Sequence, residues 1–309
     1  MIFAAVFSGQ GSQSVGMLSA LAAQNPSIAE TFSEASEALG YDLWALVQNG
    51  PESELNQTLR TQPALLTAAV AVYRLWRKRG GAAPTKMAGH SLGEYSAYVC
   101  AGAFTLADAV RLVALRGELM QRAVPEGVGA MAAVLNADDD LVTRICAEVA
   151  RDQIVAPANF NSPGQIVISG HKEAVERALL ALQSAGVKRA IRLPVSVPSH
   201  CALMRAAGPE FAAALAAIAV SAPTIEVLAN VNARSCAEPA GIRETLLAQL
   251  AEPVRWVESV RALGADRIAE FGPGRVLSGL IKRIDERVDA RALGEPDAMT
   301  KALADWSTP

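Results

Sequence analysis

The chain has 309 residues, of which 28 are Lys or Arg and 31 are Asp or Glu, so its formal net charge is −3. With 51% hydrophobic and 19% charged residues, the composition is that of a globular protein with a sizeable core, and it excludes disordered, collagen-like and disulfide-scaffold classes. The small negative net charge provides no general attraction for phosphate, so we expect no nucleic-acid partner.

The four cysteines are scattered and form no Cys-x-x-Cys pair, so we expect no zinc knuckle and no other metal site. Scattered thiols in a chain of this size fit a reducing compartment, which predicts a cytoplasmic protein. No apolar run reaches the roughly 18 residues of a membrane span, so we expect no membrane partner. The N-terminal apolar run lacks the basic region of a signal peptide, because the first cation is Arg60, and we interpret it as a buried strand.

The first 124 residues alternate short apolar strands with longer helical patterns. The predicted strands are 2–7 and 85–89, and the predicted helices are 16–24, 27–39, 63–79, 92–101 and 105–123. The 63–79 helix has proline at its start, cations in its last turn and Gly80-Gly81 after its end, which is the usual punctuation of a helix.

The order of elements changes after residue 124. The pattern there predicts strands at 130–135, 154–158, 165–169 and 189–193 and helices at 138–151 and 171–185, which is the β-α-β-β-α-β order of a ferredoxin-like unit. The earlier alternation then resumes, with helices at 202–218, 241–251 and 254–263, strands at 225–230 and 267–271, and a helix after Gly272-Pro273-Gly274. We therefore predict an α/β fold: residues 1–124 and 194–309 form a large domain with a mostly parallel sheet, interrupted by a small ferredoxin-like domain at 125–193.

The most specific local pattern is Gly89-x-Ser91-x-Gly93, which follows a short predicted strand and opens an apolar helix. A sharp strand-to-helix turn requires small neighbours, because the serine projects from a strained backbone corner. The N-terminus of the following helix supplies unpaired N–H groups and a positive dipole end where an oxyanion forms. We predict that Ser91 is a nucleophile; the alternative is a structural serine N-cap between two glycines.

A serine needs a neighbouring base to act as a nucleophile, and the chain contains three histidines. We expect His90 to point away from the Ser91 side, since neighbouring residues at a strand end face opposite ways. His171 begins a helix of the small domain, where a surface cap is the simpler interpretation. His200 remains as the predicted base, in a Val-Pro-Ser-His segment stiffened by two prolines.

The group that orients the imidazole stays open at this stage. In many serine hydrolases it is an Asp or Glu between Ser and His in the sequence, which favours Asp108 or the Asp138–Asp140 run. A glutamine also accepts the imidazole N–H and fixes its tautomer without adding a full charge. Gln249, at the end of the 241–251 helix, is one such residue, although the pattern alone does not select it.

Two further features are candidates for binding a ligand. Gly9-Gln10-Gly11 fails as a dinucleotide-binding fingerprint, because Ser14 stands where the third glycine is needed. Gln10 between two glycines instead suits a loop whose N–H approaches a ligand closely, as a second oxyanion donor beside the N–H of Leu92. Arg116 lies on a strongly apolar helix, where burial requires an anionic partner such as a substrate carboxylate. The simpler alternative is that the arginines of this helix are all solvated.

Four motifs stand in order along the chain: Gly-Gln-Gly-Ser-Gln at 9–13, Gly-His-Ser-Leu-Gly-Glu-Tyr-Ser at 89–96, Val-Pro-Ser-His at 197–200 and Gly-Pro-Gly at 272–274. Together they resemble the malonyl-CoA:acyl carrier protein transacylase family, and the resemblance runs from residue 1 to about residue 300. It implies an α/β-hydrolase-like large domain with an inserted ferredoxin-like domain. One departure is visible: the first family motif usually reads Phe-Pro-Gly-Gln-Gly, and Ser8 replaces the proline, which predicts a looser oxyanion loop.

The resemblance also implies an activity and a set of roles. The roles are nucleophile for Ser91, base for His200, carbonyl that orients His200 for Gln249, clamp on the malonyl carboxylate for Arg116, and oxyanion N–H for Gln10 and Leu92. The implied reaction transfers malonyl from malonyl-CoA to the phosphopantetheine thiol of acyl carrier protein through a malonyl-serine, with no cofactor. The expected partners are malonyl-CoA and the phosphopantetheinylated carrier protein, the expected state is a monomer, and the pathway served is fatty-acid or polyketide synthesis.

An acidic carrier protein requires a basic docking rim. The candidate clusters, each of which also fits a solvated helix face, are Arg74/Arg77/Lys78/Arg79, Lys188/Arg189/Arg192 and Lys282/Arg283/Arg287. Two other functions stay open: a serine hydrolase or thioesterase on the same motif, and a non-catalytic carrier-binding module with an unreactive Ser91. Ser199, which precedes His200, also leaves acceptance of methylmalonyl open.

Overall fold

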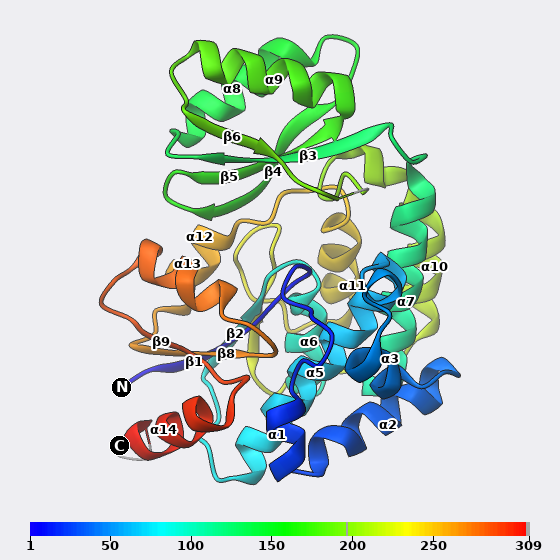
Figure 1. Ribbon diagram of the computed structural model, residues 1–309, viewed down its shortest axis with the longest axis vertical. Helices are drawn as coiled ribbons and strands as arrows, with labels where there is room; N and C mark the ends of the chain where they lie inside the picture. Colours follow the sequence, from blue (N-terminus) through cyan, green and yellow to red (C-terminus); the bar gives the residue numbers. More distant parts are fainter. Residues whose placement is uncertain (196, 307–309) are drawn as a thin grey trace.

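The computed structural model describes residues 1–195 and 197–306, and its strands form two sheets (Figure 1). The first sheet is parallel, with the order β7-β2-β1-β8-β9: β1 (Phe3–Phe7), β2 (Lys86–Gly89), β7 (Glu226–Leu228), β8 (Arg267–Phe271) and β9 (Asp289–Ala292). The second is antiparallel, with the order β4-β5-β3-β6: β3 (Gly129–Leu135), β4 (Val155–Ser162), β5 (Gln165–His171) and β6 (Arg189–Arg192).

The parallel sheet is buried on both faces. Along β1, Phe3, Ala5 and Phe7 belong to one apolar core, whereas Ala4 and Val6 belong to another, as the two-residue period of a strand requires. The first core is shared with α2 (Ser27–Leu39), α5 (Thr58–Lys78), α6 (Gly93–Cys100) and α7 (Leu106–Ala123); the second is shared with α12 (Trp256–Leu263) and α13 (Val276–Ile284). Helices on both faces of a parallel sheet are the α/β architecture predicted from the sequence.

The antiparallel sheet carries its own core. Its strands and the helices α8 (Asp139–Ala150) and α9 (Lys172–Ser184) bury a separate set of apolar residues, and Figure 1 shows both helices on the side turned away from the large sheet. The order of elements and of strands is that of a ferredoxin-like fold inserted into the larger one. The strands of this unit run from Gly129 to Arg192, whereas its exact limits at residues 125 and 193 stay a prediction.

The remaining helices complete the large part of the molecule. They are α1 (Ser19–Gln24), α3 (Leu43–Asn49), α4 (Glu52–Leu55), the 3₁₀ helix η1 (Ala202–Ala207), α10 (Gly208–Ala217), α11 (Pro239–Ala248) and α14 (Pro296–Trp306). Four of the observed elements (α3, α4, β9 and α14) were not predicted, and the predicted 202–218 helix is divided between η1 and α10. Within the described residues, no helix combines the length and apolar character needed to cross a membrane.

The start of α5 was also predicted wrongly. The helix begins at Thr58, so Pro63 lies inside it and not at its first position. The extra turn packs against α7, where a Cβ on Gly117 would lie 2.7 Å from the carbonyl oxygen of Thr58. This close approach of two backbones stabilises the first turn. The position of a proline in the sequence does not reveal such a contact, so it did not predict where the helix begins.

Candidate active site

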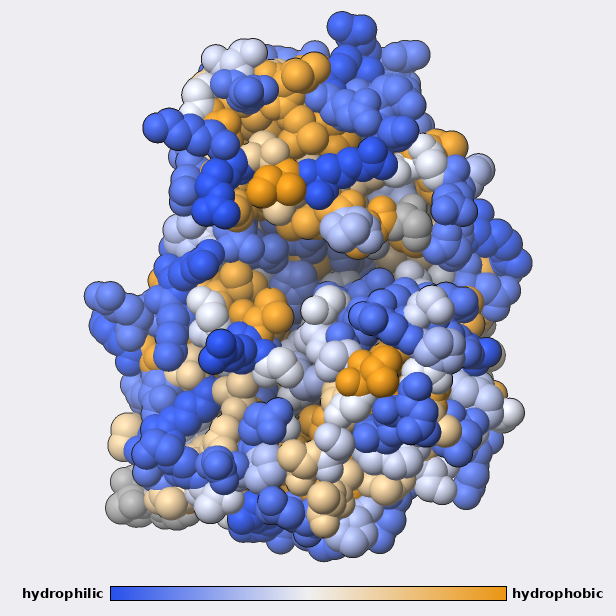
Figure 2. All heavy atoms as spheres, in the orientation of Figure 1, coloured by the Kyte–Doolittle hydropathy of each residue, from blue (hydrophilic) through white to orange (hydrophobic). Residues whose placement is uncertain are grey.

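A cavity of about 570 Å³ lies between the two sheets and contains most of the residues singled out in the sequence. It sits at the carboxyl ends of β1 and β2, the edge at which open parallel sheets bind their ligands. The face of the antiparallel sheet opposite α8 and α9 closes the other side, with Met131 and Val167 in the lining. Figure 2 shows the surface hollowed at this level, with apolar residues around the opening.

The turn that carries Ser91 cannot be built without its two glycines. A Cβ on Gly89 would lie 1.8 Å from the carbonyl carbon of Gly93, and a Cβ on Gly93 would lie 1.9 Å from the carbonyl oxygen of Phe7. Ser91 itself adopts a left-handed conformation with φ 54°. Asn230 closes the turn: its Oδ1 accepts from Ser91 N–H at 2.7 Å and its Nδ2 donates to the Gly89 carbonyl at 2.6 Å.

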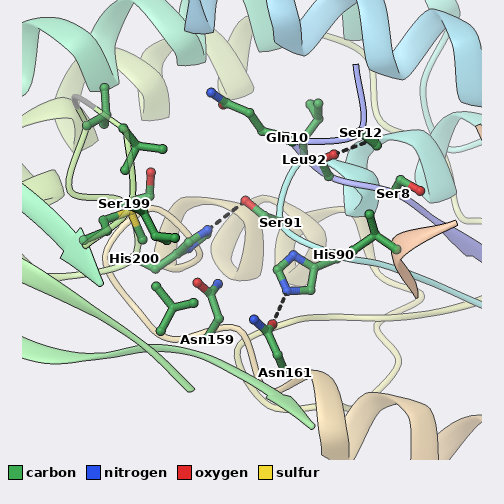
Figure 3. Close-up of a pocket in the computed structure, with 18 of the residues that line it drawn as sticks. Ser8, Gln10, Ser12, His90, Ser91, Leu92, Asn159, Asn161, Ser199 and His200 are labelled. Carbon is green, nitrogen blue, oxygen red and sulfur yellow. Dashed lines mark hydrogen bonds between the residues drawn. The ribbon is translucent and has the colours of Figure 1, made fainter. Parts of the chain in front are cut away.

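His200 meets Ser91 as the sequence predicts, across 109 residues of chain. Its Nε2 lies 2.7 Å from Ser91 Oγ (Figure 3). Its Nδ1 lies 2.8 Å from the main-chain carbonyl oxygen of Gln249. The carbonyl can only accept, so Nδ1 carries the hydrogen and Nε2 is free to accept from the serine hydroxyl. Burial, together with the nearby Arg116 charge, lowers the pKa of His200 to about 3, which keeps the imidazole neutral.

Gln249 is the residue that orients the imidazole, and it does so with its backbone. Neither Asp108 nor the Asp138–Asp140 run takes this part: Asp108 bonds to Thr105 at the start of α7, and Asp138 caps α8. Gln249 directly follows α11, where the last carbonyls of a helix lack partners within it. Its side chain is fully buried and bonds elsewhere, so the orienting acceptor does not depend on the residue type at this position.

Arg116 is buried on α7 and reaches the same cavity, which excludes the alternative of a solvated cation. Its Nη1 donates to Gln62 Oε1 at 2.9 Å, and its Nη2 donates to Gln249 Oε1 at 3.0 Å and lies 3.4 Å from Ser91 Oγ. Its Nε has no hydrogen-bond partner among the described residues. A guanidinium held by neutral amide oxygens beside a serine hydroxyl is placed to receive an anionic ligand.

Gln10 and Leu92 approach Ser91 from two different elements. Leu92 immediately precedes α6, and Gln10 belongs to the loop that follows β1; both line the cavity. The loop is pressed against the serine turn, because a Cβ on Gly9 would lie 2.5 Å from the carbonyl oxygen of His90. The glycine therefore brings the backbone of this loop into the cavity, as the sequence argument expected.

The expectation for His90 was wrong. Its side chain lines the cavity that contains Ser91, with Nε2 2.8 Å from Asn161 Oδ1 (Figure 3). Its ring also lies edge-on to Trp256. Strict alternation fails here because Ser91 leaves the strand geometry for a left-handed turn. His171 stands at the start of α9 as expected, but it is not the predicted surface cap: its side chain makes no capping hydrogen bond, and its part-buried Nδ1 accepts from the N–H of Ile154.

The chain was compared with known proteins. Residues 4–272 match the family model described as acyl transferase domain. A curated relative named malonyl CoA-acyl carrier protein transacylase, from Escherichia coli (strain K12), is 59% identical over 304 residues, which are 97% of this chain and 98% of that one. A relative of the same name from Bacillus subtilis (strain 168) is 43% identical over 302 residues, covering 96% and 95% of the two chains. The chain belongs to the malonyl-CoA:acyl carrier protein transacylase family.

Solved structures of this family show the same fold. The malonyl-CoA:acyl carrier protein transacylase from Xanthomonas oryzae superposes with a TM-score of 0.97 at 55% identity, covering 99% of both chains. A structure described as a type II PKS acyl-carrier protein in complex with its malonyl-transacylase gives a TM-score of 0.97 at 54% identity, covering 99% of this chain and 100% of that one. The chain is thus an acyltransferase of this family over nearly its whole length.

Ser8, which replaces the proline of the usual family motif, is tied down by a hydrogen bond. Its hydroxyl donates to Glu270 Oε1 at 2.7 Å, and both residues are buried at the ends of the neighbouring strands β1 and β8. Glu270 also accepts from the N–H of Leu277 and from the N–H and hydroxyl of Ser278, in the first turn of α13. The loop that carries Gln10 is therefore anchored at its start, which the expectation of a looser loop did not foresee.

Several polar residues of the transacylase site were not predicted to take part in it, although Glu94 lies within the 89–96 motif. Asn230, Gln62 and Glu94 support Ser91, Arg116 and Gln249, and Asn159 and Asn161 line the cavity from β4. Position after a parallel strand is a further usable signal, and it applies to Asn230, which follows β7. No group of His, Cys, Asp or Glu within residues 1–195 and 197–306 is arranged to hold a metal ion.

Proposed function

We propose that this chain transfers a malonyl group from malonyl-CoA to the phosphopantetheine thiol of an acyl carrier protein through a malonyl-Ser91 intermediate. The observation that carries the proposal is the 2.7 Å contact between Ser91 Oγ and His200 Nε2 beside the buried guanidinium of Arg116. The names of the relatives support the substrate and the acceptor, and the solved carrier-protein complex supports the partner. The enzyme supplies malonyl units for fatty-acid or polyketide synthesis.

In the first half-reaction, Ser91 Oγ attacks the thioester carbonyl carbon of malonyl-CoA. His200 Nε2 accepts the hydroxyl proton and delivers it to the sulfur as the C–S bond breaks, so that CoA leaves as the thiol. In the second half-reaction, the thiol of the carrier protein gives its proton to His200 and its sulfur attacks the carbonyl carbon of the malonyl ester. His200 returns that proton to Ser91 Oγ as the ester C–O bond breaks, which regenerates the serine hydroxyl. Both half-reactions balance with the serine, the imidazole and two thiols, so we propose that no cofactor takes part.

Charge develops on the carbonyl oxygen in both half-reactions. We assign its stabilisation to the backbone N–H groups of Gln10 and Leu92, which belong to the two loops that meet beside Ser91. Loss of one such donor typically costs about 10² to 10³ in rate. Arg116 is assigned to the malonyl carboxylate, and an acetyl group would leave this guanidinium without its ionic partner.

The domain limits, the oligomeric state and the location are part of the same proposal. We place the catalytic domain at residues 1–124 and 194–309 and the inserted domain at 125–193, since each part has its own core. The protein acts as a monomer, because one chain supplies Ser91, His200, Arg116 and Gln249. A cytoplasmic location is supported by Cys100, Cys146, Cys201 and Cys236, which are all free thiols.

Intact-mass spectrometry after incubation with malonyl-CoA tests the function. In the native chain, a malonyl adduct should form on Ser91, and holo carrier protein should remove it and become malonylated. The Ser91→Ala variant should form no adduct, and its transfer rate should fall by at least about 10⁴-fold. Persistence of the adduct in that variant would place the nucleophile elsewhere. Release of free malonate at the same rate with and without carrier protein would identify a hydrolase, and absence of any adduct on the native chain would identify a binding module.

A further inference from the structure

A buried carboxylate lies directly behind the serine turn. Glu94, on the first turn of α6, is fully buried, and its Oε2 accepts from Gln249 Nε2 at 2.7 Å and from the N–H of Asn230 at 3.0 Å. Its Oε1 has no hydrogen-bond partner among the described residues. A buried carboxylate with one unpaired oxygen is costly to maintain unless a counter-charge is near or the oxygen carries a proton.

The counter-charge is Arg116, and the Gln249 side chain connects the two. Gln249 Oε1 accepts from Arg116 Nη2 at 3.0 Å, while its Nε2 donates both to Glu94 Oε2 and, at 3.0 Å, to the Ser91 carbonyl. The negative end of the amide dipole therefore faces the guanidinium, and its positive end faces the carboxylate. Glu94 balances the charge of Arg116 without touching it, which leaves the guanidinium accessible from the cavity.

We propose that Glu94 is a specificity-determining residue: as a carboxylate it neutralises Arg116 in the empty site, and it takes up a proton when a carboxylated acyl group reaches Arg116. The inference rests on the proposed function, which brings that acyl group to Ser91. With the substrate in place, two carboxylates would share one buried guanidinium, and protonation of Glu94 removes the excess charge. The proton goes to Oε1, because Oε2 is already occupied by two N–H donors.

The surroundings of Glu94 allow this exchange near neutral pH. Burial raises the pKa of Glu94 to about 7, and Arg116 on α7 acts in the opposite direction. Tyr95 and Tyr98, its neighbours on the same helix, stay neutral because burial raises their pKa. His200 stays neutral because burial lowers its pKa to about 3. Asn230 and Gln249 face it without charge, so Glu94 is the group of this cluster that titrates around neutrality.

The test compares single-turnover acylation of Ser91 by malonyl-CoA and by acetyl-CoA across pH. Ionisation of CoA and of the histidines affects both rates equally, so it does not change the ratio of the two rates. In the native enzyme the malonyl/acetyl ratio should fall about fivefold or more as pH rises through 7, because ionised Glu94 opposes the incoming carboxylate. In Glu94→Gln the ratio should stay high and independent of pH. Glu270→Gln, a matched loss of a fully buried carboxylate outside this network, should keep the native pH dependence.

A second measurement uses the native chain alone, so it does not depend on how Glu94→Gln folds. In weak buffer at pH 7 with an indicator dye, acylation by malonyl-CoA should take up a fraction of a proton per site, and acylation by acetyl-CoA should take up none. An adduct that forms with a pH-independent ratio and equal proton uptake would overturn this inference and leave the transfer function standing. Absence of any malonyl-Ser91 adduct would overturn both.

Discussion

At the scale of single residues, Gln249 serves the site with two separate groups. Its main-chain carbonyl orients His200, and its side-chain amide joins Arg116, Glu94 and the Ser91 carbonyl. A side-chain substitution removes only the second set of contacts. The two roles can therefore be separated by one variant.

Gln249→Ala should keep the Ser91–His200 pair and lose much of the preference for malonyl. We expect acylation by malonyl-CoA to slow by about 10²-fold and acylation by acetyl-CoA by less than about tenfold, because Arg116 loses an acceptor that fixes its position. Pre-steady-state acylation with the two thioesters measures both. His200→Ala is the contrast, with both substrates slowed by at least about 10³-fold. Equal losses in Gln249→Ala would contradict the assigned division of roles.

Ser91 was predictable from the two glycines that flank it, and His200 from elimination among three histidines and from the prolines before it. Both adopt left-handed conformations, with φ 54° and 60°, and glycines or prolines surround each of them. Gln62 was not predictable, because it lies in the middle of the α5 pattern and its residue type does not indicate its contact with Arg116; Asn230 offered only its position after β7. The sequence therefore indicates the reacting residues, and it does not indicate the amide side chains that hold them in position.

At the scale of elements, the loop after β1 depends on how β8 and α13 meet. Glu270, at the end of β8, joins Ser8 to the first turn of α13 with four hydrogen bonds. One buried carboxylate thus sets the position of the loop that carries Gln10 relative to a helix whose Val276, Leu277 and Leu280 line the cavity. These hydrogen bonds make the end of β8 and the start of α13 a single structural unit.

Ser8→Ala should weaken this unit measurably. We expect the free energy of unfolding to fall by about 1 to 2 kcal/mol, since a hydrogen bond to a buried charged group is lost. Acylation by malonyl-CoA and by acetyl-CoA should slow to the same extent, because the loop serves the carbonyl oxygen that both substrates share. Denaturant unfolding and single-turnover acylation provide the two readings. Ser184→Ala, which removes an exposed hydroxyl bonded to a helix carbonyl, is the control and should change neither.

The elements that the sequence predicted best are those with strong apolar periodicity, such as α2, whose predicted and observed limits coincide. The strand β9 was missed because Asp289 and Arg291 interrupt its apolar pattern. It lies at the edge of the parallel sheet beside β8, where charged residues protect an open strand. An edge strand needs a partner on only one side, so its identity depends on the neighbouring strand and less on its own residues.

At the scale of the whole molecule, the cavity exists because two sheets with independent cores face each other. Only two of the three basic clusters lie beside its opening. Leu193 and Pro194, next to the 188–192 cluster, line the cavity, and Arg283 donates from α13 to Gln165, another lining residue, at 2.8 Å. Arg79 lies elsewhere, within 3.3 Å of Thr300 on α14. The structure therefore places residues of two basic clusters next to the cavity lining and Arg79 away from it.

Arg283→Glu should weaken the encounter with an acidic carrier protein and spare the chemistry at Ser91. We expect the KM for holo carrier protein to rise about five- to tenfold at low salt, and the difference to shrink as salt is added, because an exposed charge acts mainly on association. Acylation by a short malonyl thioester that lacks the nucleotide should keep its native rate, which removes the phosphates of CoA from the comparison. Arg79→Glu changes net charge by the same amount far from the opening and should leave that KM unchanged. Equal effects of the two reversals would mean that net charge, and not a docking rim formed by both sheets, governs the approach of the carrier.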